Sequence, residues 1–192
     1  ICVSFITNTT GEHIASASKA RTPEAVVQYG RTATHAHGLS QVRRMTRGFA
    51  AIGLDNPKTP TNIGGAMRAC SCYDASLMVI AGPRPLKLGS YATDTMKAYR
   101  HIPHLLVDDL FDAIPYDTVP VAVDLVDGAT PLPHYYHPER AFYIFGAEDA
   151  TLGKRILDRC RDKIIVPTHF CMNLAATVNV VLYDRAAKLA RN

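Results

Sequence analysis

Two short apolar segments of the sequence end in residues that favour close contact between the backbone and a ligand. Ala141–Phe145 is followed by Gly146, and Lys163–Val166 is followed by Pro167. Their length and their β-branched or aromatic content predict buried strands. A glycine after a strand permits close approach of a ligand, and a proline there forces an extended exit. Because ligands of α/β sheets bind at the carboxyl ends of strands, we expect a binding site where these two loops meet.

Polar side chains stand next to both loops. Glu148 lies two residues after Gly146, where its carboxylate either orients a neighbouring group or lies on the surface. Asn173 lies at the start of the apolar segment Met172–Ala190, whose spacing predicts a long helix. The amide of Asn173 either holds a substrate or caps this helix.

A third polar cluster lies at the start of an earlier helix, predicted over Asn62–Tyr73. Ile63 and Met67 belong to an apolar stripe with helical spacing, and Asn62 is predicted to cap the first turn. Arg68 lies off this stripe. By spacing alone it is a solvated surface charge, and the alternative is that it faces a site.

The sequence contains, in order, three motifs that resemble those of SpoU/TrmH-type RNA ribose methyltransferases of the SPOUT superfamily. Pro60–Arg68 resembles the N-x-G-x-x-x-R signature, and Ile144–Glu148 resembles the F-G-x-E loop. Val166–Pro167 with Cys171–Leu174 resembles the I-P…S-[LM]-N stretch. The resemblance covers Gly48–Lys188. The Met-Asn-Leu form and the lack of an added domain look most like the minimal TrmL-like branch, which modifies tRNA.

The resemblance implies a reaction and a set of site residues. The reaction is transfer of a methyl group from S-adenosylmethionine to a ribose 2′-hydroxyl of RNA, in tRNA or alternatively in rRNA, without a metal. The implied catalytic residues are Arg68, Asn173 and Glu148. The implied cofactor contacts, mostly through backbone, are Leu125, Gly146, Val166, Cys171, Met172 and Leu174. The implied RNA contacts are Asn62, Arg68, Arg84, Lys97 and Arg100.

Two residues determine how this chemistry would run. An arginine is normally too basic to accept a proton, so Arg68 is expected to hold a phosphate and stabilise the developing alkoxide. Cys171 stands where the family has serine, and a thiol donates hydrogen bonds poorly. A non-catalytic RNA-binding relative is therefore the main alternative. A third hypothesis is a small oxidoreductase, although Gly64-Gly65 is not followed by a third glycine at the position that a dinucleotide-binding fingerprint requires.

The order of elements along the chain predicts an α/β fold. Strands and helices alternate, which indicates a mostly parallel sheet with helices on both faces. Besides the two strands above, we predict strands over Gly48–Leu54, Ser76–Ala81, Leu105–Val107 and Val119–Leu125, with helices over Leu110–Ile114 and Leu152–Cys160. Pro131–Glu139 is predicted as a loop that places His134 and His137 on the surface. The resemblance adds a C-terminal trefoil knot around Cys171–Leu174, and a homodimer through the last helix.

Composition fits one globular domain with an appended segment. The 192 residues are 47% hydrophobic and 20% charged, with no apolar run of membrane-spanning length. The net charge of +4 arises in residues 1–47, which hold six basic and two acidic side chains. We predict a flexible extension over 1–46 and the methyltransferase domain over 47–192. The five cysteines lack zinc spacing and are predicted to be reduced, buried thiols of a cytoplasmic protein. His101 and His104 lack further metal ligands, so no metal site is expected.

Overall fold

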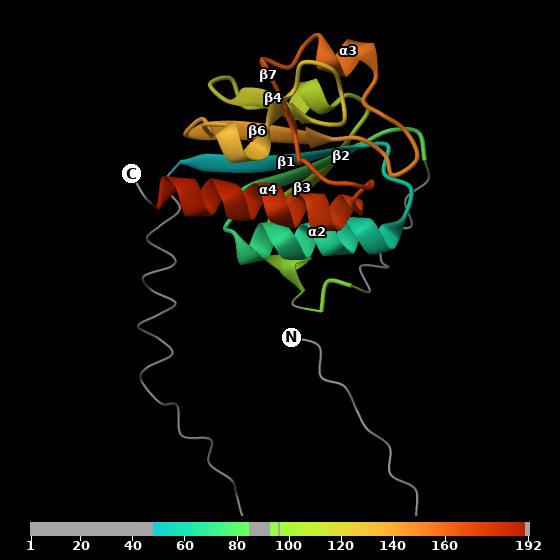
Figure 1. Cartoon of the computed structure of the whole chain (residues 1–192). Coiled ribbons are helices and arrows are strands. Elements are labelled where there is room, and N and C mark those ends of the chain that lie inside the picture. The colour runs from blue at the N-terminus through green and yellow to red at the C-terminus, as the bar shows by residue number, and fades with distance from the viewer. Residues whose placement is uncertain (1–47, 85–92, 96, 191–192) are drawn as a thin grey trace, which may run out of the picture. The chain divides into compact units, whose positions relative to one another are not determined.

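The computed structural model describes residues 48–84, 93–95 and 97–190, so the predicted extension over 1–46 lies outside the described residues. A seven-stranded sheet runs through the described residues in the order β3-β2-β1-β6-β4-β7-β5, and every pairing is parallel (Figure 1). This confirms the predicted α/β class. The strands are β1 (Phe49–Asp55), β2 (Leu77–Ala81), β3 (His104–Val107), β4 (Val119–Val123), β5 (Thr130–Pro131), β6 (Arg140–Phe145) and β7 (Asp162–Ile165).

Helices cover both faces of the sheet, as predicted, but unequally. The two long helices, α2 (Pro60–Cys72) and α4 (Leu174–Leu189), lie side by side on one face (Figure 1). The other face packs against shorter pieces, the 3₁₀ turn η2 (Leu110–Ala113) and α3 (Lys154–Leu157). Two further 3₁₀ turns are η1 (Ala98–Arg100) and η3 (Leu132–His134).

The strands contribute side chains to the apolar cores on both faces of the sheet, because neighbouring residues of a strand point to opposite faces. In β6, Tyr143 and Phe145 join the core beneath α2 and α4, whereas Phe142 and Ile144 join the core beneath η2 and α3. All four side chains are buried. The continuous apolar run, without polar alternation, is therefore what a central parallel strand requires.

Small residues let α2 and α4 approach closely. A Cβ on Gly65 would lie only 2.7 Å from the Cβ of Ala175, so only glycine fits this position of α2 without a shift. The close contact brings the first turns of the two helices together. Those turns carry Asn62 and Asn173.

Three details of the expected elements were wrong. The helix predicted over Leu152–Cys160 is confined to α3, because the chain is extended at Gly153. The loop predicted over Pro131–Glu139 contains the end of β5 and the turn η3. Asn62 is not a cap: Thr59 occupies that position, and Asn62 lies inside α2.

His137 was expected on the surface, but its side chain is fully buried. Its Nδ1 lies 2.6 Å from the Tyr143 hydroxyl, and its Nε2 lies 2.8 Å from Asp184 Oδ2. Because a carboxylate only accepts, Nε2 carries the proton and donates to Asp184, while Nδ1 accepts from Tyr143. The Tyr143 oxygen accepts in turn from Arg185. This chain of hydrogen bonds fixes the segment before β6 onto α4. His134 is exposed, as predicted.

The buried imidazole makes stability depend on pH. Burial lowers the pKa of His137 below its ordinary value, and this outweighs the hydrogen bond from the ring to Asp184. A lowered pKa in the folded state means that the unfolded chain binds the proton more tightly. The stabilisation is therefore complete above the ordinary pKa of about 6.5 and is lost as the pH falls below it.

We expect the free energy of unfolding, measured by urea titration, to decrease as the pH is lowered from 7.5 to 5. A His137→Gln variant is expected to be less stable at pH 7.5 and to show a flatter pH dependence. His134→Gln, at an exposed position on the same segment, is the matched control and is expected to keep the wild-type slope. Equal slopes for all three proteins would contradict the assignment to His137.

Candidate functional site

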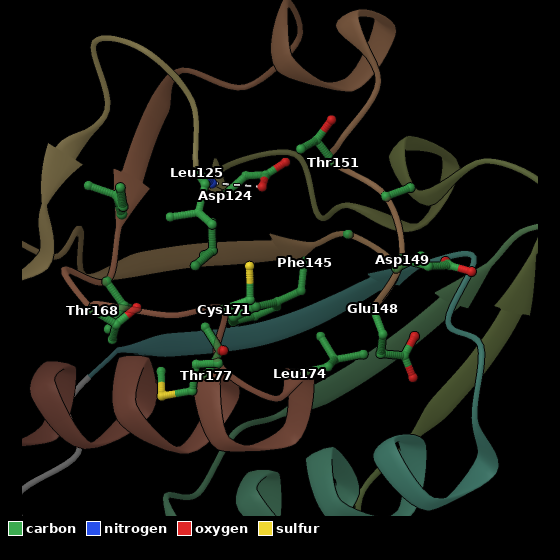
Figure 2. Close-up of a pocket in the computed structure, with 17 residues that line it drawn as sticks. Asp124, Leu125, Phe145, Glu148, Asp149, Thr151, Thr168, Cys171, Leu174 and Thr177 are labelled. Atoms are coloured by element: carbon green, nitrogen blue, oxygen red, sulfur yellow. Dashed lines mark hydrogen bonds between the residues drawn. The ribbon is translucent and has the colours of Figure 1, made fainter.

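A cavity of about 460 Å³ lies at the carboxyl ends of β4, β6 and β7 (Figure 2). Its position is the one that a parallel sheet offers to ligands. All the residues predicted to contact the cofactor line this cavity, namely Leu125, Gly146, Val166, Cys171, Met172 and Leu174. The structure thus brings these residues together around one space, and their contact with a cofactor stays a prediction.

Asp124 holds two walls of the cavity in place. β4 ends at Val123, two residues before the predicted end, and Asp124 follows it. Its carboxylate accepts from the N–H of Leu125 at 2.7 Å (Figure 2). It also accepts from the N–H of Leu152 in the loop after β6. Sequence reasoning missed Asp124, although an acidic residue directly after a strand was the available signal.

Three motif residues that lie far apart in the sequence form one chain of hydrogen bonds. The Nδ2 group of Asn173 donates to Asn62 Oδ1 at 2.8 Å, and the Nδ2 group of Asn62 donates to Glu148 Oε1 at 2.6 Å. Asn173 Oδ1 also accepts from the N–H of Ala176 at 3.2 Å, so Asn173 caps α4. We call Asn62, Glu148 and Asn173 the motif bridge.

Glu148 anchors the motif bridge to the start of α2. Its carboxylate points toward that helix in Figure 2. Oε2 accepts from the N–H of Lys58 at 2.7 Å, and Oε1 accepts from the N–H and the hydroxyl of Thr59 at 3.1 and 2.8 Å. Partial burial would raise the pKa of Glu148, but the hydrogen bonds from Lys58, Asn62 and Thr59 outweigh it, so the pKa lies below its ordinary value.

Replacing Glu148 with glutamine is expected to lower the free energy of unfolding by about 1–2 kcal/mol, because the amide NH₂ would face an N–H donor. The stability difference should shrink at acidic pH, where the carboxylate itself becomes protonated. Urea titrations at pH 7 and pH 3.5 measure both effects. Glu139→Gln, the same substitution at an exposed position, is the matched control with little change expected. A Glu148→Gln protein as stable as wild type would show that the bridge adds nothing.

Arg68 is exposed on α2, and its Nη1 donates to Thr95 Oγ1 at 3.3 Å. It does not line the cavity of its own chain, and no hydrogen bond joins it to Glu148 among the described residues. The exposure agrees with the expectation from spacing. The catalytic role implied by the family motif stays a prediction.

The three other basic residues predicted to contact RNA differ in their surroundings. Arg84 donates to both carboxylate oxygens of Asp149 at 3.1 and 3.2 Å and to the carbonyl of Asn56, so it ties two loops together. Lys97 and Arg100 are exposed beside η1. None of the three lines the cavity.

Cys2 lies outside the described residues, and the other four cysteines fall into two kinds. Cys70 and Cys160 are buried thiols, and burial raises their pKa to about 12 and about 11. Cys72 and Cys171 are exposed, which the prediction of buried thiols missed, and Cys171 lines the cavity. All four are free. In the described part of the chain, no three His, Cys, Asp or Glu side chains are grouped to hold a metal ion, and no helix is long and apolar enough to cross a membrane.

Comparisons with known proteins agree on the family. The SpoU rRNA Methylase family matches residues 50–183. The tRNA (cytidine/uridine/adenosine-2′-O-)-methyltransferase TrmJ of Pseudomonas aeruginosa (strain UCBPP-PA14) is 31% identical over 162 residues, which cover 72% of this chain and 61% of TrmJ. This chain therefore spans about three fifths of the length of that relative.

Solved structures show the same fold. The TrmH/SpoU tRNA modifying enzyme of A. aeolicus aligns with a TM-score of 0.66 and 14% identity, over 81% of this chain and 84% of that one. AviRb of Streptomyces viridochromogenes, solved with AdoMet, aligns with a TM-score of 0.66 and 19% identity, over 74% and 58%. A structure described as giving insights into 2-OH methylation of C/U34 on tRNA aligns with a TM-score of 0.65 and 20% identity, over 76% and 99%. With three ordered motifs, a matching fold and a family match over most of its length, this chain belongs to the SpoU rRNA methylase family.

Proposed function

We propose that this chain transfers the methyl group of S-adenosylmethionine to a ribose 2′-hydroxyl of RNA, with tRNA as the first substrate to test. The observation that carries the proposal is the cavity itself. It lies at the carboxyl ends of three parallel strands, and all the residues that the family motifs implicate in cofactor binding line it. Family membership and the named activity of the TrmJ relative support the same reaction.

The lining of the cavity fits an adenosyl cofactor. Its volume is in the range of small-molecule sites. Leu125, Val166 and Leu174 offer apolar surface for a purine ring, and the loops offer backbone N–H and C=O groups. Cys171 replaces the family's serine, so a contact through its backbone is retained while a hydroxyl donor is lost. When bound, S-adenosylmethionine supplies an activated methyl group on sulfur whose leaving group is a neutral thioether.

The chain itself must bring the ribose to that methyl group. Arg68 would hold a phosphate of the RNA and stabilise the alkoxide that develops on the 2′ oxygen. The motif bridge would keep α2, which carries Arg68, in fixed register with the cavity loops. Because Arg68 does not line the cavity of its own chain, we also propose a homodimer in which the two copies meet through α4, where Val180 and Tyr183 are 37% and 62% exposed.

The proposed activity is tested by incubating the chain with labelled S-adenosylmethionine and a tRNA pool or rRNA, followed by nucleoside analysis. We expect 2′-O-methyl nucleosides, and their absence from every RNA would overturn the proposal. S-adenosylhomocysteine should raise the melting temperature, whereas NAD should not. A protein that binds RNA and S-adenosylhomocysteine without turnover would favour the non-catalytic alternative. Recovery of turnover in Cys171→Ser would then assign the loss to this thiol.

Two further proposals follow from the family. The connection from β7 to α4, which contains Cys171 and Met172, would pass through an earlier loop and form the trefoil knot. We also propose that the protein works in the cytoplasm, where tRNA is available and thiols stay reduced.

A further inference from the structure

A second hollow lies at the opposite end of β7 from the cavity. It is an open groove of about 880 Å³, which we call the α3–β7 groove. Asp162 at the start of β7 lines the groove, whereas Ile165 at its end lines the cavity. In Figure 1, α3 and β7 lie at the upper end of the molecule, away from α2 and α4. The basic and aromatic side chains that line the groove are Lys154, Arg161, Lys163, His134, Tyr135 and Tyr136.

Positive charge is concentrated beside this groove. The ten residues Lys154–Lys163 contain five of the fifteen Lys and Arg residues that follow position 47, against two acidic residues. Arg155 and Arg159 point to Asp109, with N–O distances of 3.0 and 2.9 Å. The other three basic residues line the groove.

The three cations that line the groove differ in exposure and in partners. The Lys154 side chain is 86% exposed, and the Arg161 side chain is 61% exposed. Lys154 pairs with Asp158 in an exposed ion pair of little strength. Arg161 donates from Nε and Nη2 to both carboxylate oxygens of Asp162, whose side chain is 25% exposed, and both acidic residues line the groove. Lys163 is partly buried and has no ion pair with a residue that the structure describes. An anion in the groove would therefore find Lys154 and Lys163 more readily available than Arg161.

An exposed aromatic side chain lies in the same groove. Tyr136 is 91% exposed, although its neighbour Tyr135 is buried. The Tyr135 hydroxyl donates to Asp162 at 2.8 Å, and its carbonyl accepts from Lys188 at 3.0 Å, so the backbone that presents Tyr136 is held in place. A held, exposed ring beside cations can stack on an unpaired base while the cations contact phosphates.

We propose that the α3–β7 groove binds a segment of the substrate RNA away from the nucleotide that is methylated. Lys154, Arg161 and Lys163 contact its phosphates, and Tyr136 stacks on an unpaired base. This inference rests on the proposed RNA methyltransferase function. The groove and the cavity are close enough for one RNA molecule, because Thr151 lines the cavity and Lys154 lines the groove. Three residues of chain span at most about 11 Å. An exposed stacking surface favours RNA over an acidic protein partner.

The test uses the full chain and a fluorescently labelled tRNA pool, titrated at several salt concentrations. In Lys154→Ala/Lys163→Ala we expect the dissociation constant to rise about tenfold and the slope of log K against log salt to fall by about 1 to 2. In Tyr136→Ala we expect the dissociation constant to rise about tenfold with an unchanged slope. Binding of S-adenosylhomocysteine should stay at the wild-type level in both variants, which shows that the cavity is intact.

Two controls sharpen the result. Lys154→Arg/Lys163→Arg keeps the charge and should bind the tRNA pool like wild type. Arg140→Ala removes an exposed, ion-paired cation outside the groove and should leave the salt slope unchanged. Wild-type affinity and slope in the Lys154→Ala/Lys163→Ala and Tyr136→Ala variants would overturn the proposal, as would equal competition for the groove by polyglutamate. A wild-type chain that binds RNA through the groove but methylates none would instead contradict the proposed function alone.

Discussion

Replacing Arg185 with methionine is expected to lower the free energy of unfolding by about 3–5 kcal/mol, the largest stability effect of any substitution considered for this chain. Arg185 is 5% exposed on α4. It donates to the carbonyls of Pro138 and Glu139, to the more distant carbonyl of Phe49 and to the hydroxyl of Tyr143. Methionine fills a similar volume but donates to none of these acceptors. The Glu139 carbonyl keeps the N–H of Phe49 and the Tyr143 hydroxyl keeps His137, whereas the Pro138 carbonyl loses the donor that Arg185 supplies.

The stability of the Arg185→Met protein is measured by urea titration followed by circular dichroism. Arg155→Met is the matched control, because the Arg155 side chain is 68% exposed and its ion pair with Asp109 lies at the surface. This control should differ from wild type by less than about 1 kcal/mol. Arg185→Lys should fall between the two, since an ammonium group lacks the planar fork. An equal loss of unfolding free energy in Arg155→Met and Arg185→Met would contradict the structural role assigned to Arg185.

Replacing Arg68 with alanine is expected to lower the rate of methyl transfer by about 10²- to 10³-fold, the scale seen when one donor to a developing oxyanion is removed. Arg68 is exposed, and its one hydrogen bond to a residue that the structure describes is the bond to Thr95. Its loss should therefore change the free energy of unfolding by no more than about 0.5 kcal/mol. Binding of S-adenosylhomocysteine should also persist, because Arg68 does not line the cavity.

The Arg68→Ala protein is assayed by single-turnover methylation of the tRNA pool, beside Thr95→Val as the control that removes only the hydrogen-bond acceptor. Thr95→Val should keep a rate close to wild type. Arg68→Lys keeps the charge but loses the two-pronged contact with phosphate, so its rate should recover only in part. A rate for Arg68→Ala within a few-fold of wild type would remove Arg68 from the mechanism.

Local sequence was enough to place most of the sheet. The apolar runs before Gly146 and Pro167 are strands β6 and β7, and the cavity lies beyond their carboxyl ends, as strand chemistry predicts. The helix over Leu152–Cys160 is shorter than predicted because the backbone is still extended at Gly153, in a loop that the distant Asp124 carboxylate holds through the N–H of Leu152. A pattern of apolar spacing contains no information about such a partner.

The sequence by itself determined that this chain is an α/β protein with a ligand site at strand ends, because apolar runs, glycines and prolines act on the backbone where they stand. Only the tertiary structure decided what the polar residues do. Asn62 reaches Glu148 across 86 positions and Asn173 across 111, so the three share their hydrogen bonds in one bridge. His137 is buried for the same reason, since its partner Asp184 lies 47 positions away. Such pairings depend on how the sheet brings distant segments together, and a residue's type does not name its partner.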